Sequence, residues 1–111
     1  MPNKINPEKL INVTGGEADY TGILNLLLKI QEAVEHFSYD PEIAYDYEYR
    51  NIKEQLDIAI EAAKLCNTVV LKESVSDIVT LLTSISRDHA VTSRTFMPLA
   101  KKLDEEYILH I

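Results

Sequence analysis

Residues Ala18–Ser38, with the sequence ADYTGILNLLLKIQEAVEHFS, decide the fold. The apolar positions of this stretch alternate at spacings of four and three residues: Ile23, Leu27, Ile30, Val34 and Phe37. Because an α-helix turns once in 3.6 residues, this spacing places all five side chains on one face. The stretch therefore predicts an amphipathic helix of the kind that packs in a bundle.

A second helix is predicted to begin at Asp40-Pro41-Glu42 and to continue to about Asn67. An N-cap aspartate here precedes a proline at the first helical position and an acid in the first turn. The face predicted to point into the bundle comprises Tyr45, Tyr49, Ile52, Leu56, Ala59, Ala63 and Cys66. On this face Cys66 is interpreted as a small buried hydrophobe.

The third helix is predicted to begin at Ser74, where Ser74-x-x-Asp77 resembles a capping box. Its predicted apolar face comprises Val75, Ile78, Leu82, Ile85, His89 and Phe96. Residues 68–85 are rich in β-branched side chains, which leaves a strand as an alternative, but no hairpin turn chemistry accompanies them. Pro98 is expected either to kink this helix or to begin a separate C-terminal helix that carries Leu99, Leu103 and Tyr107.

At the N-terminus, Asn6-Pro7-Glu8 predicts a short helix over residues 7–12 that ends before Gly15-Gly16. This glycine pair also resembles the end of a double-glycine leader peptide, although a loop is the favoured interpretation. The apolar residues 108–111 are expected to lie on the bundle as an extended strap. The predicted fold is all-α, a single-domain antiparallel bundle of three long helices, with a short N-terminal helix and a Pro98-kinked or separate C-terminal helix.

Composition limits the classes of partner. The chain has 111 residues, 46% of them hydrophobic, which is enough for one domain whose core needs no disulfide, metal or cofactor. Its net charge of −7 and pI of about 4.8 disfavour contact with phosphate backbones. The longest apolar run, Ile23–Ile30, is too short to span a bilayer. We therefore expect no cofactor, no nucleic-acid partner and no membrane partner.

Two further features favour a cytoplasmic location. Cys66 is the only cysteine, so no intrachain disulfide can form. The first ten residues are polar and carry no apolar signal-peptide core.

Four of the six tyrosines lie between residues 39 and 49, interleaved with four carboxylates. Tyrosine offers a large contact area at low entropic cost, and carboxylates steer a basic partner. The predicted partner-binding surface comprises Tyr39, Tyr47, Asp46 and Glu48. Tyr45 and Tyr49 continue the apolar face of the second helix, so their rings are expected to pack inward. The alternative is that all four tyrosines simply cover the end of the bundle.

Asp88 and His89 form a second candidate site, because histidine titrates near neutrality and a carboxylate can orient it. Adjacent helical residues point about 100° apart, however, so His89 is also interpreted as a satisfied histidine at the edge of the core. Ser86-Arg87-Asp88-His89, with Thr92-Ser93 after it, resembles the latter part of the His-Ala-Gln-Asp-His motif, followed by Thr, of lactose/cellobiose-type IIA phosphocarriers. These are small helical proteins of similar length. The phosphorylated histidine of that family corresponds to Ile85, which cannot carry phosphate.

Metal and catalytic motifs are sparse. The chain has three histidines and one cysteine, and only Glu32 and His36 share a helix face at a ligand-like spacing. No Gly-rich phosphate loop, Gly-x-Ser-x-Gly elbow or zinc-spaced cluster occurs, which disfavours an enzyme. We expect no metal site.

These observations predict a small acidic, non-catalytic protein-binding module, such as an immunity protein, an inhibitor or an adaptor, with another protein, basic in character, as its partner. Bacteriocin immunity proteins are similar to it in size and helical build. The alternative is a degenerate phosphocarrier-like or small-ligand-binding bundle centred on Asp88 and His89. A homodimer closed through Ile58, Ile60 and Leu109 is a third hypothesis.

Overall fold

The computed structural model describes residues 20–105, which form five α-helices. Their bounds are Thr21–Glu35 for α2, Pro41–Ala44 for α3, Tyr47–Lys64 for α4, Thr68–Asp88 for α5 and Ala90–Leu103 for α6. The predicted all-α class is confirmed, and no strand occurs among residues 20–105. The predicted helix at residues 7–12, the pair Gly15-Gly16 and the tail at residues 108–111 lie outside the described residues.

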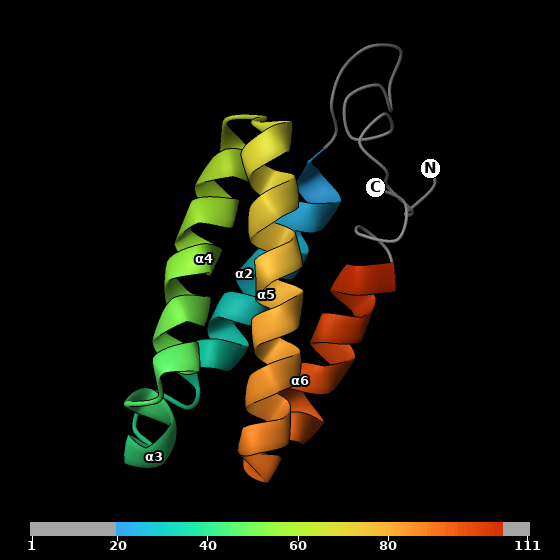
Figure 1. Cartoon of the computed structure of the whole chain (residues 1–111). Helices are drawn as coiled ribbons and strands as arrows, with labels where there is room; N and C mark the ends of the chain where they lie inside the picture. The colour runs from blue at the N-terminus through green and yellow to red at the C-terminus, as the bar shows by residue number, and fades with distance from the viewer. Residues whose placement is uncertain (1–19, 106–111) are drawn as a thin grey trace.

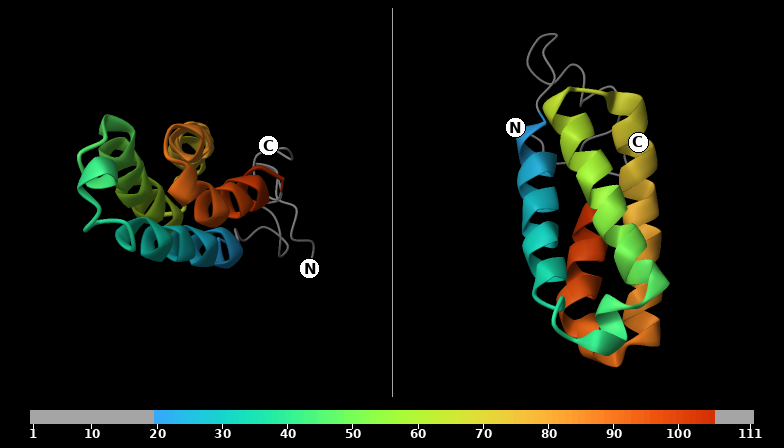
Figure 2. Two further views of the ribbon diagram at one scale, coloured as in Figure 1. Left: turned by 90° about the horizontal axis from the view of Figure 1, so that it is seen from below. Right: turned by 90° about the vertical axis from the view of Figure 1, so that its left-hand side faces the viewer.

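The four long helices, α2, α4, α5 and α6, run alternately up and down (Figure 1). Helix α4 packs on α2 and α5, and α6 packs on α5 and α2, so each long helix has two antiparallel neighbours. Figure 2 shows the same arrangement from one end, with α3 at the turn between α2 and α4. The predicted antiparallel bundle is therefore confirmed.

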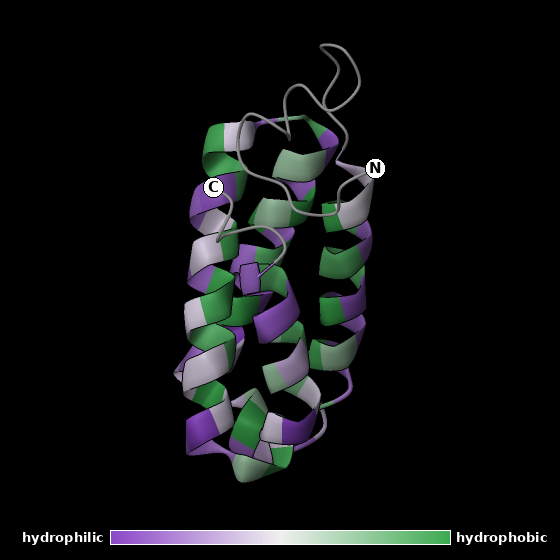
Figure 3. Cartoon of the chain, turned by 90° about the vertical axis from the view of Figure 1, so that its right-hand side faces the viewer, coloured by the Kyte–Doolittle hydropathy of each residue, from purple (hydrophilic) through white to green (hydrophobic). Residues whose placement is uncertain are grey.

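The core consists of the apolar faces that the sequence predicted. Their buried members are Ile23, Leu27, Ile30, Val34 and Phe37, then Tyr49, Ile52, Leu56, Ala59 and Ala63, then Val75, Ile78, Leu82, Ile85 and Phe96. The rings of Phe37 and Phe96 meet edge to face with centroids 5.2 Å apart, which ties the end of α2 to α6. Figure 3 shows hydrophobic and hydrophilic residues alternating along each helix, as one-sided burial requires.

The predicted second helix is divided into α3 and α4. Asp40 Oδ1 accepts a hydrogen bond from the Glu42 N–H at 3.1 Å, and Asp46 Oδ1 accepts one from the Glu48 N–H at 2.7 Å. Each aspartate therefore caps its own helix, and the chain turns between them. Because this turn changes the helical phase, Tyr45 leaves the face that Tyr49 occupies and is 80% exposed. The prediction that Tyr45 packs inward is wrong.

Helix α4 ends in a Schellman turn at Cys66. Its φ of 56° lies in the left-handed region, and the Asn67 N–H donates to the Ala62 carbonyl at 2.8 Å. Glycine usually occupies this position because a Cβ there costs about 1 kcal/mol. The Cys66 side chain is exposed rather than buried, so its interpretation as a core hydrophobe is wrong.

Helix α5 begins earlier than predicted, at Thr68, because the Asn67 side chain caps it by accepting from the Val70 N–H at 3.2 Å. Ser74 does not start the helix; its hydroxyl donates to the Val70 carbonyl within α5. The strand alternative for residues 68–85 is wrong, because all of these residues lie in α5.

The break between the last two helices falls at His89, not at Pro98. His89 has an extended backbone, with φ −130° and ψ 95°, and α6 begins at the next residue. The Thr92 hydroxyl donates to the His89 carbonyl at 2.7 Å and so stabilises the first turn of α6. The C-terminal helix is therefore separate, as one of the two alternatives predicted. It does not begin at Pro98, which lies inside α6. His89 therefore does not continue the apolar face that ends at Ile85.

Candidate functional site

Three tyrosines flank α3 with their rings in solvent. Tyr39, Tyr45 and Tyr47 are 77%, 80% and 71% exposed. They lie in the segments on either side of α3, at the end of the bundle where α2 connects to α4 (Figure 1). The ring of Tyr39 also meets that of His36 edge-on, with centroids 6.3 Å apart. We call Tyr39, Tyr45 and Tyr47 the tyrosine surface.

The two other described tyrosines are buried and hydrogen-bonded. The Tyr49 hydroxyl donates to the Val34 carbonyl at 2.5 Å, and burial together with the charge of Glu35 raises the pKa of Tyr49 to about 12. Tyr20 bonds with the Thr68 hydroxyl at 2.5 Å. Of the four clustered tyrosines, only Tyr49 therefore packs into the bundle as predicted.

Asp46 connects the corner between α3 and α4 to the junction between α5 and α6. Its Oδ1 atom caps α4, and its Oδ2 atom accepts a hydrogen bond from His89 Nε2 at 2.7 Å. Both side chains are mostly buried, with 21% of Asp46 and 19% of His89 exposed. The hydrogen bond from His89 holds the pKa of Asp46 below its ordinary value, aided by backbone donors at the start of α4 and opposed by burial.

Glu48 lies beside this pair and points toward α5. Its Oε2 atom accepts a hydrogen bond from the Ser84 hydroxyl. Its Oε1 atom is buried and has no hydrogen-bond partner in the described part of the chain. The Ser84 bond lowers the pKa of Glu48, but burial, the neighbouring Asp88 carboxyl group and the charge of Asp46 outweigh it and raise that pKa above its ordinary value.

The two sites predicted from the sequence thus meet in one place. Asp46 and Glu48, predicted for the partner surface, contact His89, Ser84 and Asp88 from the other candidate site. Tyr39 and Tyr47 stay on the outside. The two carboxylates therefore make hydrogen bonds within the bundle, while the tyrosine rings are exposed to solvent. His89 bonds to Asp46 and not to its neighbour Asp88, in keeping with its interpretation as a satisfied histidine at the core edge.

This cluster does not have the arrangement of a nucleophilic or phosphate-binding site. Ser84 bonds to Glu48 and His89 bonds to Asp46, so the hydroxyl and the imidazole serve different carboxylates. Three carboxylates in one cluster with His89 repel a phosphate group. Ile85, at the position of the phosphocarrier histidine, is fully buried. Nothing in this geometry favours a phosphocarrier-like reaction.

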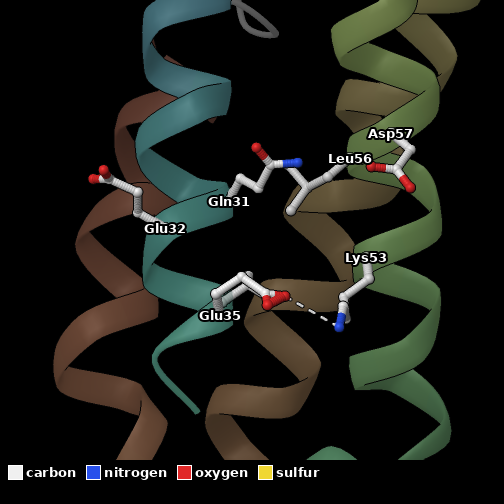
Figure 4. Close-up of a pocket in the computed structure, with 7 residues that line it drawn as sticks. Gln31, Glu32, Glu35, Lys53, Leu56 and Asp57 are labelled. Atoms are coloured by element: carbon white, nitrogen blue, oxygen red, sulfur yellow. Dashed lines mark ion pairs between the residues drawn. The ribbon is translucent and has the colours of Figure 1, made fainter. Parts of the chain in front are cut away.

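A groove of about 500 Å³ runs between α2 and α4 (Figure 4). Its lining residues are Gln31, Glu32, Val34 and Glu35 of α2 and Lys53, Leu56 and Asp57 of α4. The Lys53 ammonium pairs with Glu35 at 3.1 Å, and this pair crosses the groove. Val34 and Leu56, two apolar residues of its lining, are almost fully buried.

Residues 20–105 contain no candidate metal site and no candidate membrane-spanning helix. No group of three or more His, Cys, Asp or Glu side chains in this range is placed to hold a metal ion. None of the described helices combines the length and the hydropathy needed to cross a membrane.

Of the residues in the homodimer hypothesis, Ile58 is 39% exposed, whereas Ile60 is buried at 7% and is wrongly predicted as a surface residue. Leu109 lies outside the described residues.

Comparisons of the chain with protein-family models, with curated proteins and with solved structures gave no match. We therefore infer the function from the geometry of the site alone.

Proposed function

We propose that the chain is a non-catalytic protein-binding module that engages a basic partner through the tyrosine surface. The observation that carries this proposal is the exposure of Tyr39, Tyr45 and Tyr47, each more than 70%, within nine residues at one end of the bundle. Tyrosine is enriched in binding hot spots because its ring buries a large area while ordering few torsions. Three such rings left in solvent exceed what packing the bundle requires.

The charge around these tyrosines supports a basic partner. Residues 39–49 contain four carboxylates and no lysine or arginine, and the whole chain carries −7. Glu42 is exposed on α3, between the tyrosines. Such a field accelerates association with a positively charged protein and selects against acidic ones. The tyrosines provide the contact area, and the carboxylates provide steering.

Masking a partner by contact is the mode of action that this surface supports. The tyrosines flank α3, at the end of the bundle where α2 connects to α4, so a partner docks against that end (Figure 1). An immunity protein, an inhibitor and an adaptor all act in this way, and none of them needs a catalytic group.

The test compares three forms of the full chain as bait in a lysate of the source cells. They are the wild type, a triple variant Tyr39→Ser/Tyr45→Ser/Tyr47→Ser, and a control variant Leu65→Ser/Val69→Ser. Leu65 and Val69 are 68% and 69% exposed around the α4–α5 turn at the opposite end, so the control removes matched exposed hydrophobic side chains. All the substituted side chains are exposed, so each variant should fold with a stability close to that of the wild type.

We expect the wild type and the control to capture a basic protein in near-equal molar amount, and the triple variant to lose it. Raising the salt from about 50 to 300 mM should weaken this capture, because surface charges are screened. Equal capture by the triple variant would contradict the proposal. Capture of nothing by any form, together with a dimer in sedimentation, would replace the basic partner by a second copy of the chain.

A further inference from the structure

The tyrosine surface is tied to the rest of the bundle through titratable side chains. Tyr45, Asp46 and Tyr47 form the corner between α3 and α4, and Asp46 lies between two exposed tyrosines. The Oδ2 atom of Asp46 reaches 43 residues along the chain to His89, the single residue between α5 and α6. In the first turn of α4, Glu48 reaches Ser84 on α5.

We propose that Glu48, together with Ser84, Asp88 and the bond between Asp46 and His89, forms a proton-operated clasp that holds the α3–α4 corner against the α5–α6 junction at low pH and loosens as the pH rises through the titration of Glu48. The clasp itself is a property of the free chain and needs no partner. Its consequence for partner binding, treated below, rests on the proposed function of the tyrosine surface.

The first half of the clasp is the bond between His89 and Asp46. The lowered pKa of Asp46 keeps its carboxylate ionised into acidic solution. His89 Nε2 donates to the Oδ2 atom of this carboxylate at 2.7 Å, and a hydrogen bond to a charged acceptor is stronger than one between neutral groups. This half of the clasp attaches the α3–α4 corner to the α5–α6 junction.

The second half of the clasp is the carboxyl pair of Glu48 and Asp88. Ser84 satisfies Glu48 Oε2, but Oε1 is buried without a partner in the described part of the chain, which disfavours the ionised form. A proton on this pair removes the repulsion between the carboxylates and allows one to donate to the other. The raised pKa of Glu48 gives the sign: the stabilisation is present at low pH and is lost as the pH rises through that pKa.

The Glu48 half of the clasp therefore closes on proton uptake and opens on proton release. The charged groups that face the clasp are Asp46 at the α3–α4 corner, Glu48 on α4, Asp88 on α5 and His89 at the α5–α6 junction. Within residues 20–105, no charged side chain of α2 or α6 takes part in these hydrogen bonds or ion pairs. A proton, not a metal ion, is the occupant that fits, because no set of ligands in this range is placed around a cation.

Partner binding should follow the state of the clasp. The backbone of Asp46 fixes the directions of both neighbouring tyrosines, and ordering them before contact reduces the entropy lost on binding. A basic partner should therefore dissociate more slowly at pH 5.5 than at pH 8. This consequence fails if the tyrosine surface binds nothing, but the clasp itself can still be measured in the free chain.

The experiment measures amide hydrogen exchange of the full chain by NMR between pH 4.5 and 8, in the presence of EDTA. The probes are the N–H groups of Asp46 and Glu48, which donate to the Ile43 carbonyl and to Asp46 Oδ1. The amide of Asn67, hydrogen-bonded at the opposite end of the bundle, is the internal reference. Protection factors correct for the intrinsic effect of pH on exchange.

Protection at Asp46 and Glu48, relative to Asn67, should fall as the pH rises, by up to tenfold per pH unit for each proton released. Glu48→Gln should keep its half closed and show higher protection than the wild type at pH 8. Asp88→Asn, which removes an exposed carboxylate whose charge raises the pKa of Glu48, should move the fall in protection to lower pH. Glu42→Gln, which removes a carboxylate of the same corner outside the clasp, should leave the wild-type profile unchanged.

Three results would overturn the clasp. One is a wild-type profile that is flat at both probes, and another is a slope that Glu48→Gln and Asp88→Asn each leave unaltered. The third is protection at pH 8 that rises when Zn²⁺ or Mg²⁺ is added without EDTA, since the acidic group would then be a cation site. Each single variant is read against its own far-UV circular dichroism, and loss of fold in one leaves the other as the test.

Discussion

Replacement of Asp46 by alanine should destabilise the bundle far more than the same replacement of Asp40. The two aspartates occupy equivalent positions, because each accepts a hydrogen bond from the N–H two residues later and is followed by an acid in the first turn. They differ in one contact: only Asp46 also receives a hydrogen bond from His89. Asp40→Ala is therefore a matched control for the His89 contact.

The magnitude follows from the two contacts of Asp46. Loss of an N-cap costs about 1 kcal/mol, and loss of a hydrogen bond to a charged group costs about 1.5–3 kcal/mol. Because about a fifth of each partner is exposed, we take the lower end of the second range. Asp46→Ala should therefore cost about 2–3 kcal/mol and Asp40→Ala about 0.5–1 kcal/mol. At about 4 °C per kcal/mol, the two melting temperatures should differ by about 6 °C.

The assay is urea unfolding at pH 6 followed by circular dichroism, with Asp46→Asn as a third variant that keeps the cap but removes the charge. A double-mutant cycle with His89→Gln should assign about 1 kcal/mol to the pair. The lowered pKa of Asp46 means that its stabilisation is present above the ordinary pKa and is lost as the pH falls through the folded one. The wild type should therefore lose more stability than Asp46→Ala below pH 4. Equal losses for Asp46→Ala and Asp40→Ala would refute the reasoning.

Three further substitutions test the packing of the bundle, each by its urea midpoint. Tyr49→Phe should cost about 1 kcal/mol because it removes the buried hydrogen bond to the Val34 carbonyl. Because the pKa of Tyr49 is raised to about 12 in the folded chain, the variant should also lose less stability than the wild type between pH 10 and 12. An unchanged urea midpoint would mean that the hydrogen bond contributes nothing to stability. Cys66→Gly should stabilise by about 0.5–1 kcal/mol because the residue has a φ of 56°, and a destabilised variant would argue against the Schellman turn. Pro98→Ala should stabilise by about 1–3 kcal/mol because Pro98 lies exposed inside α6, whereas a loss of stability would show that Pro98 contributes favourably to α6.

The fold was predictable because its core is encoded by local periodicity. The face of α2 from Ile23 to Phe37 is buried as predicted, and Asp40-Pro41 starts a helix as its capping chemistry requires. The break at Asp46 also had a signal, since Asp46-Tyr47-Glu48 repeats the acid-x-acid pattern of Asp40-Pro41-Glu42. The unbroken apolar spacing from Tyr45 to Tyr49 concealed it.

For the candidate site, the sequence predicted the exposed residues but not the contacts that the carboxylates make within the bundle. Tyr39 and Tyr47 were identified from composition, but the inward turn of Asp46 and Glu48 depends on contacts 43 and 36 residues away. No periodicity reports such distances. The break at His89 was missed for a related reason, because Pro98 is the stronger helix breaker in isolation, whereas tertiary packing retains it inside α6. Asn67 before Thr68 was a capping signal that the β-branched run concealed.

Hydroxyl-radical footprinting of the chain, alone and mixed with a protein captured in the pull-down, tests the proposed binding function most directly. Tyr39, Tyr45 and Tyr47 should be oxidised readily in the free chain and protected in the complex, while the buried Tyr49 should react slowly in both. Binding at the tyrosine surface predicts that Leu65 and Val69, at the other end, react equally in the two samples. Protection of Leu65 and Val69 with unchanged oxidation of the three tyrosines would contradict it.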